Sequence, residues 1–100
     1  MKRMKDVFAE QQRIIMLQLM FQDSDYSLND QLLQRALDLF GHAISIDRID
    51  AHLRFLEDCD LVEVDDLGHG MLVAKLTQKG MDVAQGRIRM DGIDRPIPLE

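Results

Sequence analysis

The sequence predicts an α+β fold of four helices and one β-hairpin, and three observations carry this prediction. Apolar residues recur at steps of three and four between residues 45 and 58, which is the spacing of a helix with one buried face. Leu61-Val62-Glu63-Val64 follows at once, with the partial alternation of a half-buried strand. Gly68-His69-Gly70 separates this strand from a second apolar run, which completes a hairpin over residues 61–76. A helix that leads directly into a two-stranded hairpin is the second half of a winged helix-turn-helix.

Length and composition set the broad class of the protein. One hundred residues, 46% of them hydrophobic, are enough for one domain with a real core. No apolar run approaches the length that crosses a bilayer, and no small-residue cleavage site follows the basic N-terminus. We therefore expect a cytoplasmic protein with no membrane partner. The formal net charge of −6 lowers the expectation of nucleic-acid binding, because phosphate contacts favour a basic surface.

The first helix is expected from residue 6 to residue 22. From Ile14 to Phe21 every residue except Gln18 is apolar, which is a wider stripe than one core-facing side of a surface helix needs. Either this helix is central to the domain, or its second face packs against another subunit. A domain of this size has little interior in which to hide such a helix, so we expect both arrangements together. The predicted homodimer interface includes Phe8, Ile15, Met16, Leu19 and Met20.

Two further helices and a turn precede the hairpin. Ser27 is expected to cap a helix over residues 27–40, and Gly41 ends this helix in the left-handed conformation. Ser45 is expected to cap the third helix, over residues 45–58.

A short fourth helix is expected over residues 77–85, with Thr77 as its N-cap and Gly86 directly after it. Residues 1–86 then form the winged-helix domain. Residues 87–100 are expected to be an extended tail, because they hold one glycine and both prolines. Apolar side chains distinguish this tail from a plain solvated one: Ile88, Met90, Ile93 and Ile97.

Three local patterns resemble those of small winged-helix proteins: the helix end and strand start from Leu53 to Val62, the short glycine-containing wing, and the strand-to-helix junction Leu76-Thr77-Gln78-Lys79-Gly80. Five further segments carry a second resemblance: Tyr26-Ser27-Leu28-Asn29, Leu39-Phe40-Gly41-His42, Asp47-Arg48, Leu76 to Gly80, and Arg95-Pro96. Over nearly its full length the chain resembles a family of small winged-helix proteins from Mu-like phages and prophages. This resemblance implies a winged-helix fold and a phage origin, in a bacterial host cell, and it implies no activity.

The first functional hypothesis is a phage transcriptional regulator that binds double-stranded DNA as a dimer. In a DNA-binding winged helix the third helix enters the major groove and the wing contacts the backbone. Asp47 and Asp50 would face the same groove as Arg48 and Arg54 and repel phosphates. Residues 57–66 hold six acids and no Lys or Arg, which also argues against DNA. The candidate DNA contacts, including a basic N-terminal arm, are Ser45, Arg48, His52, Arg54, His69, Lys2, Arg3 and Lys5.

A simpler interpretation of these cations stays open. Arg48 and Arg54 would then only make the surface soluble, with weak ion pairs to neighbouring acids. The basic N-terminal arm would be a frayed chain end.

The second functional hypothesis is a protein-interaction module built on a winged-helix frame. Its acidic strip between the third helix and the wing, which includes Asp60, Glu63 and Asp65, would contact a basic protein partner.

No residue pattern indicates catalysis or a cofactor. His42, His52 and His69 lack the paired spacing of metal ligands. The chain has no Gly-x-Ser-x-Gly motif, and its glycines form no phosphate-cradling loop. We therefore expect a protein that is not an enzyme and that uses no metal and no cofactor.

Overall fold

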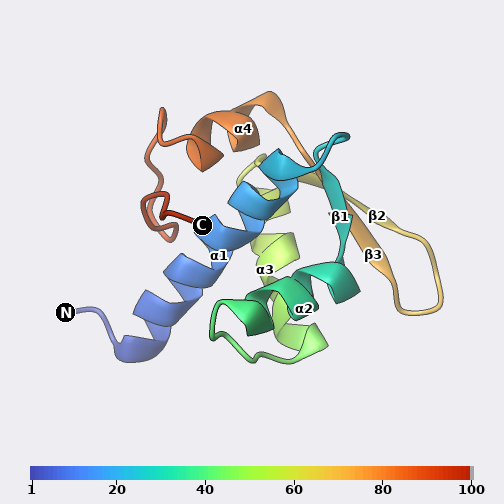
Figure 1. The fold of residues 1–100 in the computed structure, drawn as a ribbon, viewed down its shortest axis with the longest axis horizontal. Helices are drawn as coiled ribbons and strands as arrows, with labels where there is room; N and C mark the ends of the chain where they lie inside the picture. The colour runs from blue at the N-terminus through green and yellow to red at the C-terminus, as the bar shows by residue number, and fades with distance from the viewer. Residues whose placement is uncertain (100) are drawn as a thin grey trace.

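The structure is a computed structural model that describes residues 1–99. In chain order its elements are α1 (Met4–Gln22), β1 (Ser27–Asn29), α2 (Asp30–Leu39), α3 (Ile46–Asp58), β2 (Val62–Asp66), β3 (Leu72–Leu76) and α4 (Gln78–Ala84). The three strands form one antiparallel sheet in the order β1-β3-β2 (Figure 1). The helix pair α2 and α3, followed by the β2–β3 hairpin, is the arrangement expected of a winged helix-turn-helix.

The third helix, the hairpin and the fourth helix lie within one residue of their predicted limits. α3 begins after Ser45, whose hydroxyl accepts a hydrogen bond from the Arg48 backbone N–H at 3.2 Å. α4 begins after Thr77, whose Oγ1 accepts a hydrogen bond from the Gly80 N–H at 3.0 Å. Both N-caps were predicted, because capping depends only on residues within one helical turn.

The start of the second helix differs from the prediction. Ser27 is not its N-cap but opens β1, which pairs with β3. Asn29 caps α2 instead, since its Oδ1 accepts a hydrogen bond from the Leu32 N–H at 2.8 Å. Tyr26, with φ +58°, precedes the three residues that run along β3. A strand of three residues is too short to show an alternating pattern, so the sequence did not reveal it.

α1 packs against the three other helices and against the sheet. Ile15, Met16 and Met20 are at most 1% exposed in a single chain, so the wide apolar stripe is explained by burial within one copy. These three residues therefore offer no surface to a second copy, which corrects their assignment to a dimer interface. Of the other two predicted interface residues, Phe8 is 49% exposed and Leu19 is partly buried.

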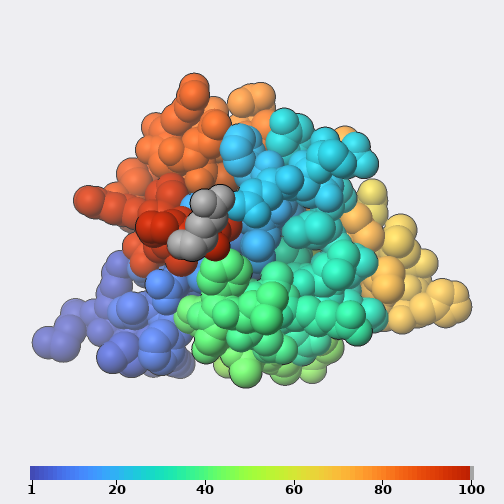
Figure 2. All heavy atoms as spheres, viewed as in Figure 1, coloured from blue at the N-terminus to red at the C-terminus, as the bar shows by residue number. Residues whose placement is uncertain are grey.

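Residues 87–99 contain no helix or strand, yet they pack back onto α1. Figure 2 shows this segment between α4 and the N-terminal half of α1. Ile93 is buried, and the Gln18 side chain bonds both backbone groups of Ile97, at 2.9 and 3.2 Å. The last residue of the predicted tail, Glu100, lies outside the described residues. The division of the chain into a domain and a tail stays a prediction.

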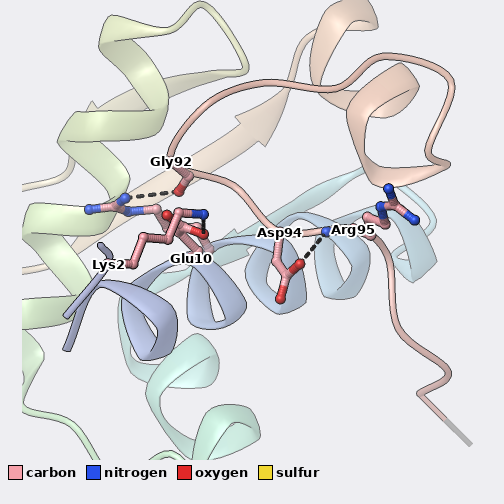
Figure 3. Close-up of polar contacts among 6 residues, drawn as sticks. Lys2, Glu10, Gly92, Asp94 and Arg95 are labelled. Carbon is pink, nitrogen blue, oxygen red and sulfur yellow. Dashed lines mark hydrogen bonds and ion pairs between the residues drawn. The ribbon is translucent and has the colours of Figure 1, made fainter. Parts of the chain in front are cut away.

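Arg13 connects this C-terminal segment to α3. Its Nη1 donates a hydrogen bond to the Gly92 carbonyl at 2.9 Å, and its guanidinium carbon lies 3.8 Å from the centroid of the Phe55 ring. A Cβ on Gly92, which has φ +85°, would lie 2.7 Å from Phe55 Cζ, so only glycine fits against the ring. The Asp94 N–H donates to the Glu10 carbonyl at 3.2 Å, and Figure 3 shows Gly92 and Asp94 beside Glu10.

Two carboxyl groups join the helices of the helix-turn-helix. Asp30, at the start of α2, is fully buried, and its Oδ2 accepts a hydrogen bond from the Leu72 N–H of β3 at 3.3 Å. Asp50 of α3 lies within hydrogen-bonding reach of Asp30. The Oδ1 atoms of both residues are buried and have no hydrogen-bond partner within residues 1–99.

Gly80 lies where α4 crosses the start of β2. A Cβ at this position would overlap the Leu61 carbonyl oxygen and would lie 3.0 Å from Leu76 Cδ2. Thr77 holds the same junction, because its N–H donates to the Leu61 carbonyl at 3.0 Å and its Oγ1 donates to the Asp60 carbonyl at 2.7 Å. The helix and the backbone of the strand therefore meet without room for a side chain.

We expect the substitution Gly80→Ala to lower the free energy of unfolding by about 3 kcal/mol or more, because the new methyl group must displace backbone. Urea denaturation followed by circular dichroism measures this loss. Gly68→Ala is the matched control, since φ is +81° there but no atom lies within 4 Å of the added Cβ. The control should cost only about 1–2 kcal/mol, and equal losses at the two glycines would contradict the packing argument.

Candidate nucleic-acid interface

One side of α3 faces solvent and forms the candidate recognition surface. Arg48 lies in its first half and makes no side-chain hydrogen bond or ion pair within residues 1–99. Ile49, Leu53 and Leu56 form the opposite, buried side. The exposed residues at the start of and along the helix are Ser45, Asp47, Arg48, Ala51, Arg54 and Asp58.

Arg54, in the second half of this surface, is engaged by an acid. Its Nη1 lies 3.1 Å from Glu57 Oε1, and Glu57 Oε2 accepts a hydrogen bond from the Val64 N–H of β2 at 3.2 Å. The ion pair is open to solvent, with side-chain exposures of 52% and 36%. Exposed ion pairs of this kind contribute about 0.2–1 kcal/mol to the stability of a protein. A phosphate group can therefore replace the Glu57 carboxylate as the partner of Arg54.

Only one of the two acids expected to oppose the arginines is directed to solvent. Asp47 is exposed, but Asp50 is partly buried against Asp30. Burial raises the pKa of Asp50 to about 6, and the hydrogen bond and negative charge of Asp30 act in the same direction. Asp50 is therefore part of the contact between α2 and α3, and it does not line the exposed side of α3.

His52 is an interior residue, which corrects its assignment as a DNA contact. The His52 side chain is 3% exposed. Arg13 Nε donates a hydrogen bond to His52 Nδ1 at 3.2 Å. The ring proton of His52 therefore lies on Nε2, which donates to Gln12 Oε1 at 2.9 Å. The Gln12 amide nitrogen lies 3.2 Å from His42 Nδ1, which extends the chain of bonds to the turn before α3. Burial, together with the charges of Arg13 and Arg48, lowers the pKa of His52 to about 4.

The wing carries the wrong charge for a phosphate contact. His69, at the tip, is exposed and has φ +56°. Exposed acids lie at the end of α3 and along β2, and we call them the acidic strip: Asp58, Asp60, Glu63, Asp65 and Asp66. This strip repels a polyanion, so the wing is a poor surface for a phosphate contact through His69.

The basic N-terminal arm divides into two parts. Lys2 Nζ lies 2.7 Å from Glu10 Oε1, and Figure 3 shows this pair beside the C-terminal segment. Arg3 Nε lies 3.3 Å from Asp6 Oδ2. Lys5 makes no side-chain hydrogen bond or ion pair within residues 1–99, and it lines a surface hollow together with Arg48. The structure thus brings Lys5, Arg3 and Arg48 together and leaves Lys2 and His69 elsewhere.

Within residues 1–99, no three His, Cys, Asp or Glu side chains come close enough together to hold a metal ion. No helix in this part of the chain is both long and apolar enough to cross a membrane.

No protein-family model matches the chain. It is 37% identical over 93 residues to the uncharacterized protein gp26 of Escherichia phage Mu, and the match covers 93% of this chain and 95% of gp26. The chain belongs to the gp26 family of Mu-like phage proteins. An uncharacterized protein of Haemophilus influenzae is 33% identical over 75 residues, which is 75% of this chain and 72% of the relative. The resemblance to proteins of Mu-like phages, noted from the sequence, is therefore confirmed.

Two solved structures share the fold of this gp26-family chain. One is RosR of H. salinarum, with a TM-score of 0.63 and 20% identity over 73% of this chain and 64% of the RosR chain. The other is a complex structure of the same protein, described as RosR-S1, with a TM-score of 0.60 and 22% identity over 73% and 62%. This likeness concerns the fold and is consistent with the predicted winged helix-turn-helix. The chain spans less than two thirds of RosR.

The sequence contained a signal for the buried position of His52 that its assignment as a DNA contact ignored. His52 follows Ile49 by three residues and precedes Leu56 by four, so it belongs to the buried face of the third helix. Its partners Gln12 and Arg13 were not singled out, because no local pattern connects residues that lie about forty positions away in the chain.

The buried groups Asp50 and His52 should give opposite pH dependences of stability. Asp50 binds its proton more tightly in the folded state, so its contribution is present below pH 4 and is lost as the pH rises through 6. His52 binds its proton less tightly when folded, so its contribution is lost as the pH falls from 6.5 to 4. Relative to the unsubstituted protein, the stability of Asp50→Asn should therefore rise with pH over this window, and that of His52→Gln should fall.

Chemical denaturation at pH 4, 5, 6 and 7 measures both differences. Because each variant is compared with the unsubstituted protein, the titration of groups that do not interact with the substituted side chain cancels. Differences that do not change with pH would show that these side chains have the same proton affinity in the folded and unfolded states.

Proposed function

We propose that this gp26-family protein binds double-stranded DNA through the exposed side of α3 and acts as a phage transcriptional regulator. The observation that carries the proposal is the free guanidinium of Arg48, on the first half of a solvent-facing helix in a helix-turn-helix pair. In proteins with this arrangement the N-terminal residues of the second helix reach the base edges of the major groove.

The distribution of charge supports DNA binding better than the net charge does. Asp50 is turned into the contact with Asp30, and Arg54 holds Glu57 in a weak, exposed pair. The acidic strip lies after the second half of α3 and along β2, which leaves the first half of α3 beside Lys5 and Arg3. The total of −6 is therefore unevenly spread over the surface, and local charge decides phosphate binding.

Arg48→Ala should weaken binding to DNA and should lower the slope of log affinity against log salt by about 1, because one cation that meets the nucleic acid is removed. Fluorescence anisotropy with fragments of the phage genome, from low to physiological salt, measures both quantities. Arg87→Ala is the control, since Arg87 is exposed just after α4 and carries the same charge. Equal affinities for the two variants would exclude the α3 surface, and no binding at low salt would exclude DNA as the partner.

We also propose that two copies act together, as many helix-turn-helix proteins do on symmetric sites. Because Ile15, Met16 and Met20 are buried within one copy, the interface must use residues that stay accessible on α1, including Phe8. Sedimentation at tens of micromolar should give a dimer, since most soluble oligomers are symmetric assemblies of this kind. A monomer at that concentration would contradict this part of the proposal.

The acidic strip supports a second candidate, a module that binds a basic protein partner. Its five carboxylates are exposed, and no Lys or Arg occurs from residue 57 to residue 66. Such a surface favours a cationic partner and speeds its encounter with the protein. Reversing Asp60, Glu63 and Asp65 to lysine would abolish capture of that partner without weakening DNA binding.

A further inference from the structure

Cations from two helices that are far apart in the sequence line one hollow on the surface. The hollow has a volume of about 230 Å³ and lies between the start of α1 and the first half of α3. Its charged lining consists of Arg3, Lys5, Arg13 and Arg48 against the single carboxylate of Asp6. In a chain with a net charge of −6, this is a local excess of positive charge.

A second hollow, of about 330 Å³, shares two of these cations. Lys5 and Arg48 line it as well, together with the Ser45 side chain and with no carboxylate. Lys5 and Arg48 therefore lie on the boundary between two depressions, one from each helix. The exposed acid nearest to them in the sequence of α3, Asp47, lines neither hollow.

The remaining cations of the first hollow are already engaged. Arg3 is paired with Asp6, and Arg13 donates to His52 and to the Gly92 carbonyl while it lies over the Phe55 ring. Lys5 and Arg48 make no side-chain bond within residues 1–99. Two unpaired cations beside a fixed guanidinium form a set of hydrogen-bond donors that suits a phosphate group.

The position of the hollow also separates this site from the wing. Figure 1 shows the start of α1 and the β2–β3 loop at opposite ends of the long axis of the molecule. The wing end carries Asp65 and Asp66 of the acidic strip, and the α1 end carries the cations. A polyanion that lies on the first half of α3 is therefore attracted toward α1 and repelled from the wing.

We propose that Lys5 of α1 and Arg48 of α3 together hold one phosphate group of the DNA backbone, beside the groove that α3 enters. This inference rests on the proposed function and adds the element that contacts the DNA backbone. In this protein α1 makes the backbone contact that is expected of the wing. Arg13 positions the site from beneath, since its contacts with α3 and the C-terminal segment keep the two helices together.

Lys5→Ala should weaken DNA binding about fivefold at 0.15 M salt, which is the loss expected from one phosphate contact with a salt slope near 0.9. The double variant Lys5→Ala with Arg48→Ala should lose less than the product of the two single losses, because both side chains hold the same phosphate. Fluorescence anisotropy over a salt series measures all three variants. Lys75→Ala, which removes an exposed lysine from β3, is the matched control.

Lys2→Ala separates a defined site from a diffuse basic arm. Lys2 carries the same charge three residues away but is paired with Glu10 beside the C-terminal segment, so its loss should change affinity less than twofold. Equal effects of Lys2→Ala and Lys5→Ala, or losses that multiply in the double variant, would overturn the shared phosphate site while DNA binding itself persists. If the unsubstituted protein binds no DNA at low salt, the proposed function fails first.

Inorganic phosphate provides the remaining comparison. Titration into the protein at constant ionic strength, followed by NMR of backbone amides around Lys5 and Arg48, should give no saturation at millimolar concentration, because one isolated anion lacks the rest of the duplex interface. Saturable binding of inorganic phosphate, combined with no effect of Lys5→Ala on DNA, would assign the site to a free phosphate ligand and overturn the proposal.

Discussion

The burial of the central turns of α1 holds the other elements in place. Ile14, Ile15, Met16 and Leu17 are four consecutive residues, and each is at most 1% exposed. A helix covered on all sides needs partners in every direction, and it finds them in α2, α3, α4, the sheet and the C-terminal segment. At about 25 cal/mol per Å² of apolar area removed from water, this contact is a main contribution to the stability of so small a domain.

Polar residues on the same helix determine how α3 is held. Gln12 and Arg13 come directly before these apolar turns, and their side chains bond the two ring nitrogens of His52. The neutral imidazole can accept from one partner and donate to the other, so every polar atom at this buried contact is satisfied. Arg13 also binds the Gly92 carbonyl, so α3 and the C-terminal segment are attached to one side chain. Burial of a bonded network favours one arrangement of α1 and α3 over others.

The fold, and not the amino-acid composition, determines where acidic and basic side chains lie on the surface. Acids dominate the region from the end of α3 to the wing, while Lys5 and Arg48 line one hollow at the other end of α3. The relatives in phage Mu and Haemophilus influenzae place the chain in a family, and RosR shares its fold, but neither comparison identifies the surface that binds a partner. That surface is inferred from which cations remain unpaired, and the same property connects α1 with α3 in one candidate interface.

The sequence by itself determined the order and limits of most elements. Local patterns define the N-caps Ser45 and Thr77 and the two strands of the hairpin, because each depends on residues only a few positions apart. They can therefore be recognised from the sequence. The short strand β1 was missed because its only partner, β3, lies more than forty residues further along the chain.

Only the tertiary structure decided which side chains are interior and which cations are free. His52 bonds to Gln12 across 40 residues, and Lys5 and Arg48 line one hollow across a similar separation, so no local pattern specifies either arrangement. Ile15, Met16 and Met20 were assigned to a homodimer interface for the same reason, although they are buried within one copy. An apolar stripe indicates that one face of a helix must be buried, whereas the tertiary structure determines which elements bury it.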